Sequence, residues 1–435
     1  MYQGIKTVSF EEAVKVVKSG DRIHIHSVAC APPGLIQALC NRGRAGELRD
    51  VKLQHLHTEG SAPYAEAEFE GIFFLESYFV GSNVRKPTQE GYADYVPVHL
   101  SETQKLIRSG IHPVDVAMIQ VCPPDKHGFV SMGTSVDATL AAVQNAKTVI
   151  GVINPNVPRA WGDAIIKLSD IDIFCEDNTP LIEAHPATLT EQDIAIGKNV
   201  ASLIEDGATL QMGIGAIPNA VLSQLGNHKN LGIHTEMFAD GVLPLYEKGV
   251  VNNMNKKFDK GKIVSTFLMG SKRVYDFIDD NPGVAMMDVG YTNDPFIIAQ
   301  QPKMTAINSA LSVDITGQVN ADSLGIKFYS GSGGQLDFIR GAAASEGGKP
   351  IIALPAVTNK GVSKICPTLL NGAGVVTTRF DVHYIVTEFG IADLYGKTLQ
   401  ERAKTLINIA HPDHRETLDK AAFERFGSHY HFISK

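Results

Sequence analysis

Glu236 is the residue of this chain best placed for covalent chemistry. It follows His234 and Thr235, and it stands fewer than 20 residues after a glycine-rich loop, Leu210-Gln-Met-Gly-Ile-Gly-Ala-Ile-Pro218. A carboxylate is a poor nucleophile in water, but desolvation and fixed N–H donors can make it attack an activated acyl group. The pattern predicts a carboxylate nucleophile beside a backbone cradle. The alternative is a solvated loop whose carboxylate accepts backbone hydrogen bonds.

The glycine-rich loop could supply the donors that such a nucleophile requires. It is predicted to join a strand to a helix, so that its N–H groups point at an anion or a carbonyl oxygen. The alternative is a plain strand-to-helix turn, because a single G-x-G is a weak signal and the third glycine of the dinucleotide fingerprint is absent. Oxyanion donors are expected from the side chain of Gln211 and from the backbone of Gly213, Ile214, Gly215, Ala216 and Ile217.

Two further segments carry features that are typical of ligand sites. The loop that follows Tyr329 places Gly331, Gly333 and Gly334 within four positions, which lets a flat ligand lie directly on the main chain. Glu388 comes at the predicted end of a buried strand, where open α/β sheets keep functional groups. The alternatives are a flexible surface turn for the loop and a helix N-terminal carboxylate for Glu388.

An internal repeat predicts the elements that position these residues. Residues 19–39 and 206–225 both read as a strand, a small-residue loop and a helix. In the same order, 57–59 (His-Thr-Glu) corresponds to 234–236, 127–131 to 316–320, and 149–154 to 350–355. Four correspondences in one order indicate two homologous domains.

The fold class follows from the alternation of strands and helices. Short β-branched runs such as 351–354 and 382–386 are typical of buried parallel strands, and they alternate with helical stretches such as 399–409. This favours an α/β fold in which each homologous domain is an open, mostly parallel sheet flanked by helices. We predict an N-terminal domain over 1–185 and a C-terminal domain with the catalytic glutamate over 186–435, joined in the polar, proline-containing stretch 176–190.

The composition excludes several function classes. A formal charge of −8 and 44% apolar residues in 435 indicate a globular protein without a nucleic-acid partner. Five scattered cysteines without C-x-x-C spacing argue against disulfides and structural zinc. His24, His26, His55 and His57 alternate as strand residues do, so no metal site is predicted. No P-loop is present, and no leader or membrane-spanning run, so we expect a soluble, cytoplasmic protein that does not use triphosphates.

The motifs resemble those of the acetyl-CoA hydrolase/transferase family, in its branch of butyrate:acetate and 4-hydroxybutyrate CoA-transferases. The resemblance runs from about residue 5 to the end of the chain. It is carried by Gln211-Met-Gly-Ile-Gly-Ala-Ile-Pro218, His234-Thr-Glu236, Ile307-Asn-Ser-Ala-Leu-Ser-Val-Asp-Ile-Thr-Gly317, Tyr329-Ser-Gly-Ser-Gly-Gly334, Thr387-Glu-Phe-Gly-Ile-Ala392, Gly396-Lys-Thr-Leu-Gln-Glu-Arg-Ala403 and Ile409-Ala-His-Pro412.

The resemblance implies a role for most of these residues. Both domains would be of the CoA-transferase type, and Glu236 would form acyl-anhydride and glutamyl-CoA thioester intermediates. The glycines at 331–334 would contact CoA, while Asn308 and Glu388 would position the pantetheine or the attacking carboxylate. Coenzyme A is then a substrate, no cofactor is tightly bound, and the family suggests a homodimer or homotetramer without membrane or nucleic-acid partners.

These expectations point to a CoA-transferase that works by ping-pong covalent catalysis. It would exchange CoA between butyryl-CoA or 4-hydroxybutyryl-CoA and a carboxylate such as acetate. The exchange conserves one thioester, so it is nearly isoergic and requires neither triphosphate nor metal. One alternative is an acyl-CoA hydrolase that uses the same glutamate. The other is a CoA-binding subunit without catalysis, against which the intact Gln211 and Glu236 argue.

The two halves are expected to divide their labour. Glu59 occupies the position in the repeat that corresponds to Glu236, but no G-x-G loop precedes it, so we interpret it as a decayed counterpart. The small and apolar residues Val28, Ala29 and Ala31 suit the wall of an acyl pocket better than an oxyanion site. We therefore expect catalysis from about residue 190 onward, with the first domain closing the site over the acyl chain.

Overall fold

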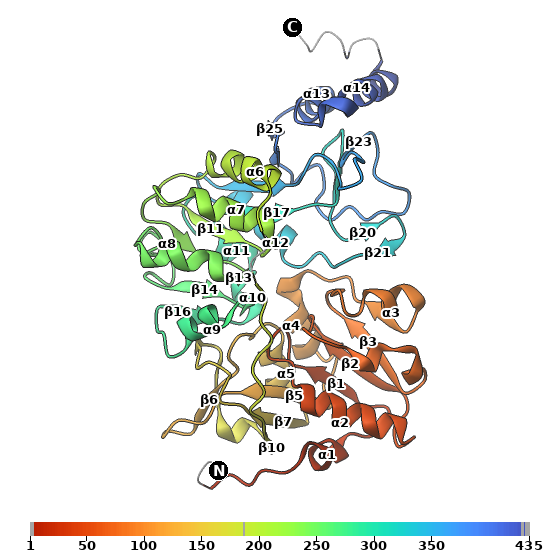
Figure 1. Ribbon diagram of the computed structural model, residues 1–435, viewed down its shortest axis with the longest axis vertical. Helices are drawn as coiled ribbons and strands as arrows, with labels where there is room; N and C mark the ends of the chain where they lie inside the picture. Colours follow the sequence, from red (N-terminus) through yellow and green to blue (C-terminus); the bar gives the residue numbers. More distant parts are fainter. Residues whose placement is uncertain (1–3, 186–187, 428–429, 431–435) are drawn as a thin grey trace. The chain divides into compact units, whose positions relative to one another are not determined.

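The computed structural model describes residues 4–185, 188–427 and 430. Two compact units make up the chain (Figure 1). The first comprises residues 1–185 and 262–293, and the second comprises residues 186–261 and 294–435. None of the helices in the described part of the chain is long and apolar enough to cross a membrane.

The first unit is built on a parallel sheet of seven strands in the order β10-β7-β5-β1-β2-β3-β4. All six residues of its interior strand β5 are buried, as expected where helices cover both faces of a sheet. Its strands are β1 (Arg22–Ile25), β2 (Val51–His55), β3 (Phe73–Ser77), β4 (Ala93–Tyr95), β5 (Val116–Val121), β7 (Thr148–Ile153) and β10 (Ile173–Glu176). Its helices before the second unit are α1 (Phe10–Ala13), α2 (Pro33–Arg44), α3 (Arg85–Glu90), α4 (Leu100–Arg108) and α5 (Thr139–Asn145).

Residues 262–293 belong to the first unit, although they follow part of the second in the chain. Strand β16 (Val284–Met286) pairs in parallel with β14 (Ile263–Ser265) and with β8 (Trp161–Gly162). The Arg108 guanidinium also donates to Asp288, at 2.7 Å. The predicted division into 1–185 and 186–435 differs from the structure in this segment, because pairing between strands so distant in sequence leaves no local signal. The other elements here are β6 (Phe129–Ser131), β9 (Ile165–Lys167), β15 (Phe267–Leu268), α9 (Lys272–Ile278) and α10 (Val289–Thr292).

The second unit is built on a sheet of six strands in the order β12-β11-β17-β22-β24-β25, parallel except for β25. Its strands are β11 (Thr209–Met212), β12 (Gly232–Ile233), β17 (Thr305–Ser309), β22 (Lys349–Ala353), β24 (Tyr384–Thr387) and β25 (Gly390–Asp393). Its helices are α6 (Glu191–Ala201), α7 (Ala216–Gln224), α8 (Leu243–Glu247), α11 (Pro295–Ala299), α12 (Gln335–Ala344), α13 (Leu399–Asn408) and α14 (Pro412–Phe426). Short strands complete it: β13 (Met237–Phe238), β18 (Ser312–Asp314), β19 (Val319–Asn320), β20 (Ser323–Leu324), β21 (Lys327–Phe328) and β23 (Ile365–Cys366).

The two sheets share one topology, which confirms the predicted repeat. In the first sheet the strands lie in the order β10-β7-β5-β1-β2. In the second sheet the order is β24-β22-β17-β11-β12, so the strands correspond one to one in both sequence and space. The predicted strands at 351–354 and 382–386 are β22 and β24, and the predicted helix at 399–409 is α13. The predicted class, an α/β fold of two homologous, mostly parallel sheets flanked by helices, is therefore confirmed.

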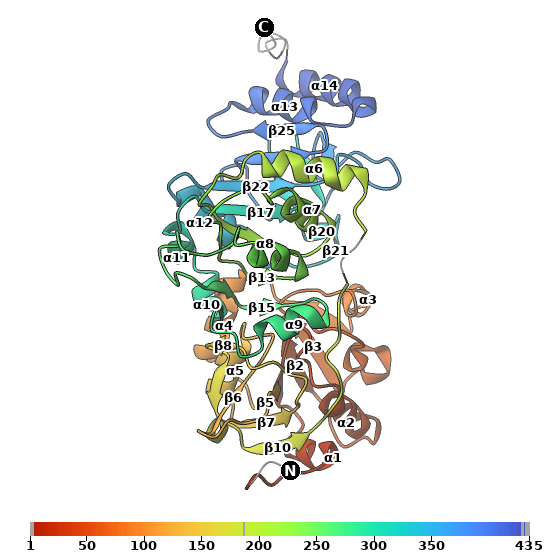
Figure 2. The ribbon, with the colours of Figure 1, turned by 60° about the vertical axis from the view of Figure 1, so that its left-hand side comes forward.

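Chain direction explains why helices cover both faces of each sheet. The connection β11-α7-β12 moves toward one side of the second sheet, whereas β17-α12-β22 moves toward the other. Because such crossovers are right-handed, opposite directions place α7 and α12 on opposite faces. Figure 2 shows α7 and α12 on either side of β17 and β22. In sheets of this kind, ligands bind at the carboxyl ends of the parallel strands.

Candidate active site

Four parallel strands of the second unit bring the predicted site residues to one edge of its sheet. The glycine-rich loop follows β11, the Glu236 turn follows β12, Asn308 is the penultimate residue of β17, and Glu388 follows β24. Because the strands are parallel, their carboxyl ends lie at the same edge. The sheet order places the Glu236 turn and the glycine-rich loop on neighbouring strands.

The glycine-rich loop presents its backbone openly at this edge. Gly215 has φ +114°, and a Cβ added at Gly213 or Gly215 would meet no atom within 4 Å. The side chain of Ile214 is 47% exposed. Helix α7 begins at Ala216, and the N–H groups of a first helical turn have no partner within the helix. The structure thus leaves the backbone of 213–217 open where a helix begins, the setting in which N–H groups can donate to an anion.

Thr235 ties the Glu236 turn to the end of β11. Its hydroxyl accepts a hydrogen bond from the N–H of Met212 (3.2 Å) and lies 2.9 Å from the carbonyl oxygen of the same residue. The hydroxyl also lies 2.8 Å from the carbonyl oxygen of Met237. Thr235 is fully buried, while Glu236 is partly exposed. The turn that carries the partly exposed Glu236 is therefore held beside the strand that leads into the glycine-rich loop.

Gln211 and Asn308 form a pair on adjacent strands. The side-chain N–H of Asn308 donates to Oε1 of Gln211 at 3.0 Å, and Nε2 of Gln211 lies 3.4 Å from Oδ1 of Asn308. Gln211 is only 5% exposed, so this pairing fixes the orientation of its amide. An amide nitrogen has two protons, so the pair can still offer a donor to a substrate oxygen.

The second glycine-rich loop is fixed to the same edge through the residue that follows it. Helix α12 begins at Gln335, whose side chain donates to the carbonyl oxygen of Ser309 at the end of β17 (2.7 Å). Thr377 donates to the same side chain at 2.9 Å. Gly333 has φ +53°, a backbone conformation that disfavours a side chain. The main chain of 331–334 therefore reaches the carboxyl edge beside Asn308.

Glu388 lies on the same edge but apart from Glu236. Strand β24 is four positions from β12, which at a spacing of about 4.8 Å separates the strand axes by roughly 19 Å. The carboxylate of Glu388 accepts hydrogen bonds from the side chain of Gln192 (2.6 Å) and from the N–H of Ala356 (2.9 Å). Burial lowers the pKa of Lys364, and the charge of Glu388 opposes that shift. These contacts suit Glu388 to ordering the edge of the site rather than to covalent chemistry.

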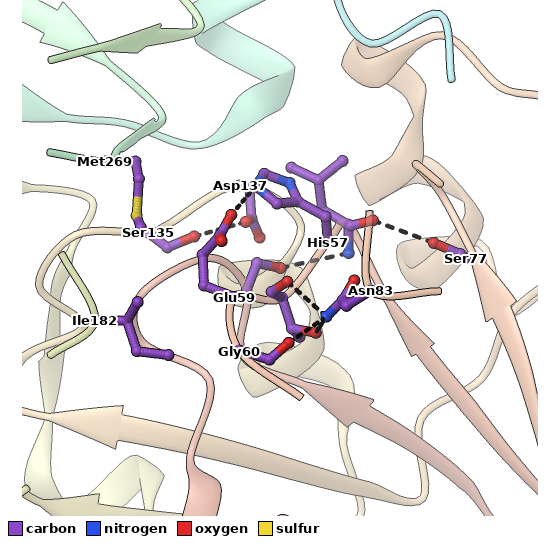
Figure 3. A network of polar contacts seen from close by, with 12 residues as sticks. His57, Glu59, Gly60, Ser77, Asn83, Ser135, Asp137, Ile182 and Met269 are labelled. Atoms are coloured by element: carbon purple, nitrogen blue, oxygen red, sulfur yellow. Dashed lines mark hydrogen bonds and ion pairs between the residues drawn. The ribbon is translucent and has the colours of Figure 1, made fainter. Parts of the chain in front are cut away.

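The first unit carries a differently built turn at the corresponding place (Figure 3). Asn83 holds it by donating to the carbonyl oxygens of Thr58 (2.9 Å) and Gly60 (3.1 Å). The carboxylate of Glu59 lies 3.6 Å from the ring of His57, and burial raises its pKa. In place of the glycine loop stands Val28 with φ +57°, a strained conformation for a β-branched residue.

A pocket of about 390 Å³ lies in the first unit beside this turn. The residues predicted to form an acyl-pocket wall, Val28, Ala29 and Ala31, do line it, and Glu59 contributes a carboxylate. A cavity of this size with an apolar lining and few polar groups is typical of small-molecule sites. The other lining residues are Pro33, Ile36, Gln37, Gly60, Ser61, Pro63, Gln120, Thr179, Pro180, Leu181 and Ile182.

Histidines of the first sheet surround a buried aspartate. Asp137 is fully buried and accepts hydrogen bonds from the hydroxyls of Ser135 (2.7 Å) and Thr139 (2.9 Å). The ring of His24 lies 3.0 Å from the Thr139 hydroxyl, and the ring of His55 lies 2.9 Å from that of Tyr64. Burial lowers the pKa of His24 to about 4, against the charge of Asp137, and lowers the pKa of His55 to about 3. Both imidazoles are thus kept neutral.

These histidines predict a loss of stability in mild acid. In the unfolded chain the pKa of each histidine returns to near 6.5. Below that pH the unfolded chain therefore binds protons, whereas His24 in the folded chain stays unprotonated down to about pH 4. Each such histidine adds about 1.4 kcal/mol per pH unit to the fall in the free energy of unfolding. Denaturant melts between pH 7 and pH 5 should show this slope, reduced in His55→Gln and unchanged in His127→Gln, where the histidine is exposed. An unreduced slope in both His24→Gln and His55→Gln would contradict the assignment.

Sequence reasoning missed two residues that hold the Glu236 segment. Asn253 and Lys256 are both fully buried, and they bond the backbone of Ile233. They lie in the polar run Asn252-Asn-Met-Asn-Lys-Lys257, which by composition indicates a solvated loop. No local signal in that run distinguishes Lys256 from its exposed neighbours, since its burial depends on the tertiary fold.

Comparison with known proteins agrees with the geometry. The model of the acetyl-CoA hydrolase/transferase N-terminal domain matches residues 2–183, and that of the C-terminal domain matches residues 270–422. A succinyl-CoA:acetate/propanoyl-CoA:succinate CoA transferase of Fasciola hepatica is 52% identical over 95% of this chain and 87% of its own length. A 4-hydroxybutyrate coenzyme A transferase of Clostridium kluyveri is 47% identical over 97% of this chain and 98% of its own length.

A solved structure shows the same architecture. The crystal structure of RipA from Yersinia pestis superposes with a TM-score of 0.91 at 36% identity and covers 97% of each chain. Agreement over the full length at this identity includes both units and both sheets. The resemblance carried by the motifs is therefore confirmed: the chain belongs to the acetyl-CoA hydrolase/transferase family and is an enzyme of its CoA-transferase branch.

Proposed function

We propose that the protein exchanges CoA between a short-chain acyl-CoA, butyryl-CoA or 4-hydroxybutyryl-CoA, and a carboxylate such as acetate. The observation that carries the proposal is the placement of Glu236 in the turn after β12, next to the strand that leads into the open glycine-rich loop, with Thr235 joining the two. A nucleophile and a row of N–H donors are what acyl transfer requires. The names of the relatives from Clostridium kluyveri and Anaerostipes caccae, a 4-hydroxybutyrate and a butyryl-CoA:acetate CoA-transferase, support the acyl groups chosen.

The proposed reaction proceeds through two covalent intermediates. The Glu236 carboxylate attacks the thioester carbonyl and expels the CoA thiolate, which leaves an acyl-glutamyl anhydride. The thiolate then attacks the glutamyl carbonyl, releases the first carboxylate and leaves a glutamyl-CoA thioester. Acetate attacks that thioester, and the thiolate returns to the acetyl carbonyl of the new anhydride. Acetyl-CoA departs and the carboxylate of Glu236 is regenerated.

Each of the other residues has a part in this proposal. Gln211 and the N–H groups of 213–217 stabilise the oxyanion of each tetrahedral intermediate. The main chain of 331–334 holds CoA, with Asn308 and Glu388 ordering the pantetheine or the attacking carboxylate. Coenzyme A enters and leaves as a substrate, so the proposal includes no tightly bound cofactor. We propose a homodimer or homotetramer in the cytoplasm as the working form.

The test is to incubate the protein with butyryl-CoA, with and without acetate. Acetyl-CoA that forms only when acetate is present supports transfer. Free thiol released without acetate supports the alternative, an acyl-CoA hydrolase in which water takes the place of acetate. If neither acetyl-CoA nor free thiol forms, the proposal is contradicted. A panel of butyrate, 4-hydroxybutyrate and succinate as acceptors then ranks the acyl groups, including that named for the relative from Fasciola hepatica.

We propose that the pocket of the first unit accepts the acyl chain, and this predicts a change of specificity. Ala29 is only 4% exposed and lines that pocket, so phenylalanine there should fill the space that a butyryl chain needs. Ala29→Phe is expected to shift the ratio of kcat/KM toward acetyl-CoA over butyryl-CoA by about tenfold. This is about the discrimination that a hydrophobic pocket achieves when the substrate differs by one to two methylene groups. The exposed Ala45→Phe serves as the control. An unchanged ratio in folded Ala29→Phe would place the acyl chain elsewhere.

The same division of labour predicts the effect of Glu59→Gln. Because Glu236 is the nucleophile, the amide should leave kcat within about fourfold of the wild type, far from the orders of magnitude that removal of a nucleophile costs. A loss comparable to that in Glu236→Gln would make the site one of two carboxylates.

A further inference from the structure

Strand β12, which leads directly into the Glu236 turn, is the edge strand of its sheet. The N–H and C=O groups along an edge need partners or water. In the first unit the corresponding strand β2 has β3 beside it, paired from Val51↔Phe73 to His55↔Ser77. The second sheet ends at β12 on that side. Something other than a strand must therefore hold the edge next to the nucleophile.

Residues 250–256 take the place of the missing strand. The N–H of Leu231 donates to the carbonyl oxygen of Val250 (2.9 Å), and the N–H of Asn253 donates to the carbonyl oxygen of Leu231 (3.0 Å). Two side chains continue the edge: Asn253 accepts from the N–H of Ile233 through Oδ1 (2.8 Å), and Lys256 donates to the carbonyl oxygen of Ile233 through Nζ (2.9 Å). We call Asn253 and Lys256 the clamp.

Lys256 is an unusual residue to bury for packing alone. Its side chain is fully buried, and burial lowers its pKa to about 7 against the opposing charge of Asp259. An ammonium loses several kcal/mol of hydration when buried, whereas methionine would fill the same volume without that loss. The alkyl part crosses β12 at Gly232, where a Cβ would lie 2.7 Å from Cγ of Lys256. A hydrogen bond to Ile233 is one thing that the lysine adds and methionine could not.

The backbone that the clamp holds is coupled to Glu236 through two fixed residues. The N–H of His234 donates to the carbonyl oxygen of Leu210 (3.1 Å), and its ring lies 3.5 Å from Nε2 of Gln301. Thr235 is bonded to Met212 on the neighbouring strand. A shift of Ile233 would therefore move the turn that carries Glu236. Misplacement of a reacting group by about 1 Å can cost roughly a hundredfold in rate.

We propose that Asn253 and Lys256 are positioning residues that set the place of the Glu236 carboxylate by clamping the open edge of β12. The inference rests on the proposed role of Glu236 as the nucleophile. It predicts that loss of the clamp slows the chemical step and leaves binding of acyl-CoA intact, since both side chains bond the backbone of Ile233, whereas CoA is proposed to bind at 331–334.

The backbone at residue 253 offers a matched pair of variants. Asn253 has φ +60°, which glycine and aspartate tolerate better than most residues do. Asn253→Gly removes the acceptor for the N–H of Ile233, whereas Asn253→Asp keeps an acceptor oxygen in its place. Lys256→Met keeps the alkyl volume and removes the donor. We expect kcat to fall by about tenfold or more in Asn253→Gly and Lys256→Met, with KM for butyryl-CoA within threefold, and to stay within threefold in Asn253→Asp.

Rapid-quench measurement of the glutamyl-CoA adduct at residue 236, per folded molecule, decides the matter. Slower formation in Asn253→Gly and Lys256→Met, with recovery in Asn253→Asp, supports the clamp. Formation at the wild-type rate in both would overturn it, whatever the loss of thermal stability. If Lys256→Met does not fold, the Asn253 pair decides alone. Absence of an adduct at 236 in the wild type would refute the proposed nucleophile instead, so the two failures are distinguishable.

Discussion

Replacement of Glu236 by alanine is expected to lower kcat for CoA exchange by more than a hundredfold. The side chain supplies the carboxylate of the turn that follows β12, beside the strand that leads into the glycine-rich loop, and no anhydride or thioester can form on a methyl group. Removal of a covalent nucleophile normally costs several orders of magnitude. The measurement is the initial rate of acetyl-CoA formation from butyryl-CoA and acetate.

Two controls accompany Glu236→Ala. Glu59→Gln removes the carboxylate at the corresponding position of the first unit and should retain activity. Binding of butyryl-CoA by Glu236→Ala, followed by equilibrium dialysis, should stay near the wild-type value, because the proposed CoA loop is untouched. Activity above about a hundredth of the wild-type rate in Glu236→Ala would mean that another group is the nucleophile.

Replacement of Gly333 by valine is expected to raise KM for acyl-CoA by at least tenfold. The loop at 331–334 reaches the carboxyl edge of the sheet through the bond from Gln335 to Ser309, and there its main chain should meet CoA. A valine at φ +53° is strained, and its branched side chain would stand where the ligand lies. Tenfold corresponds to about 1.4 kcal/mol of binding.

A second glycine separates the effect on CoA from the effect of strain. Gly361 has φ +76°, and a Cβ there would meet no atom within 4 Å, so Gly361→Val imposes a similar backbone penalty outside the proposed CoA loop. This control should lower thermal stability without changing KM. If folded Gly333→Val shows the KM of the wild type, CoA binds elsewhere.

The sequence was sufficient for the fold class, because it depends on local patterns. Glycine loops, β-branched runs and the repeated His-Thr-Glu segment lie within short windows, and the repeat placed them on equivalent strands. Pairings between distant segments left no such signal. Gln211 and Asn308 were both singled out, but their mutual hydrogen bonds depend on β11 lying beside β17.

The features that the sequence did not predict depend on tertiary contacts. Lys256 stands beside Lys257 in a polar run, and only the tertiary structure shows that one of the two is buried under β12. The missing glycine loop predicts a decayed counterpart in Glu59, and the structure adds that this residue lies on the wall of a pocket. The pairing of β16 with β8, which assigns 262–293 to the first unit, likewise joins segments more than 100 residues apart.

The central claim is that Glu236 carries CoA as a thioester, and borohydride trapping tests it most directly. The wild-type protein is incubated with butyryl-CoA without an acceptor, reduced, digested and examined by mass spectrometry. We predict that the side chain of residue 236 is reduced to the alcohol, that Glu59 is not, and that acetate added before the borohydride prevents the reduction. An unreduced Glu236 in protein that is inactivated by the treatment, or reduction at another carboxylate, would contradict the account.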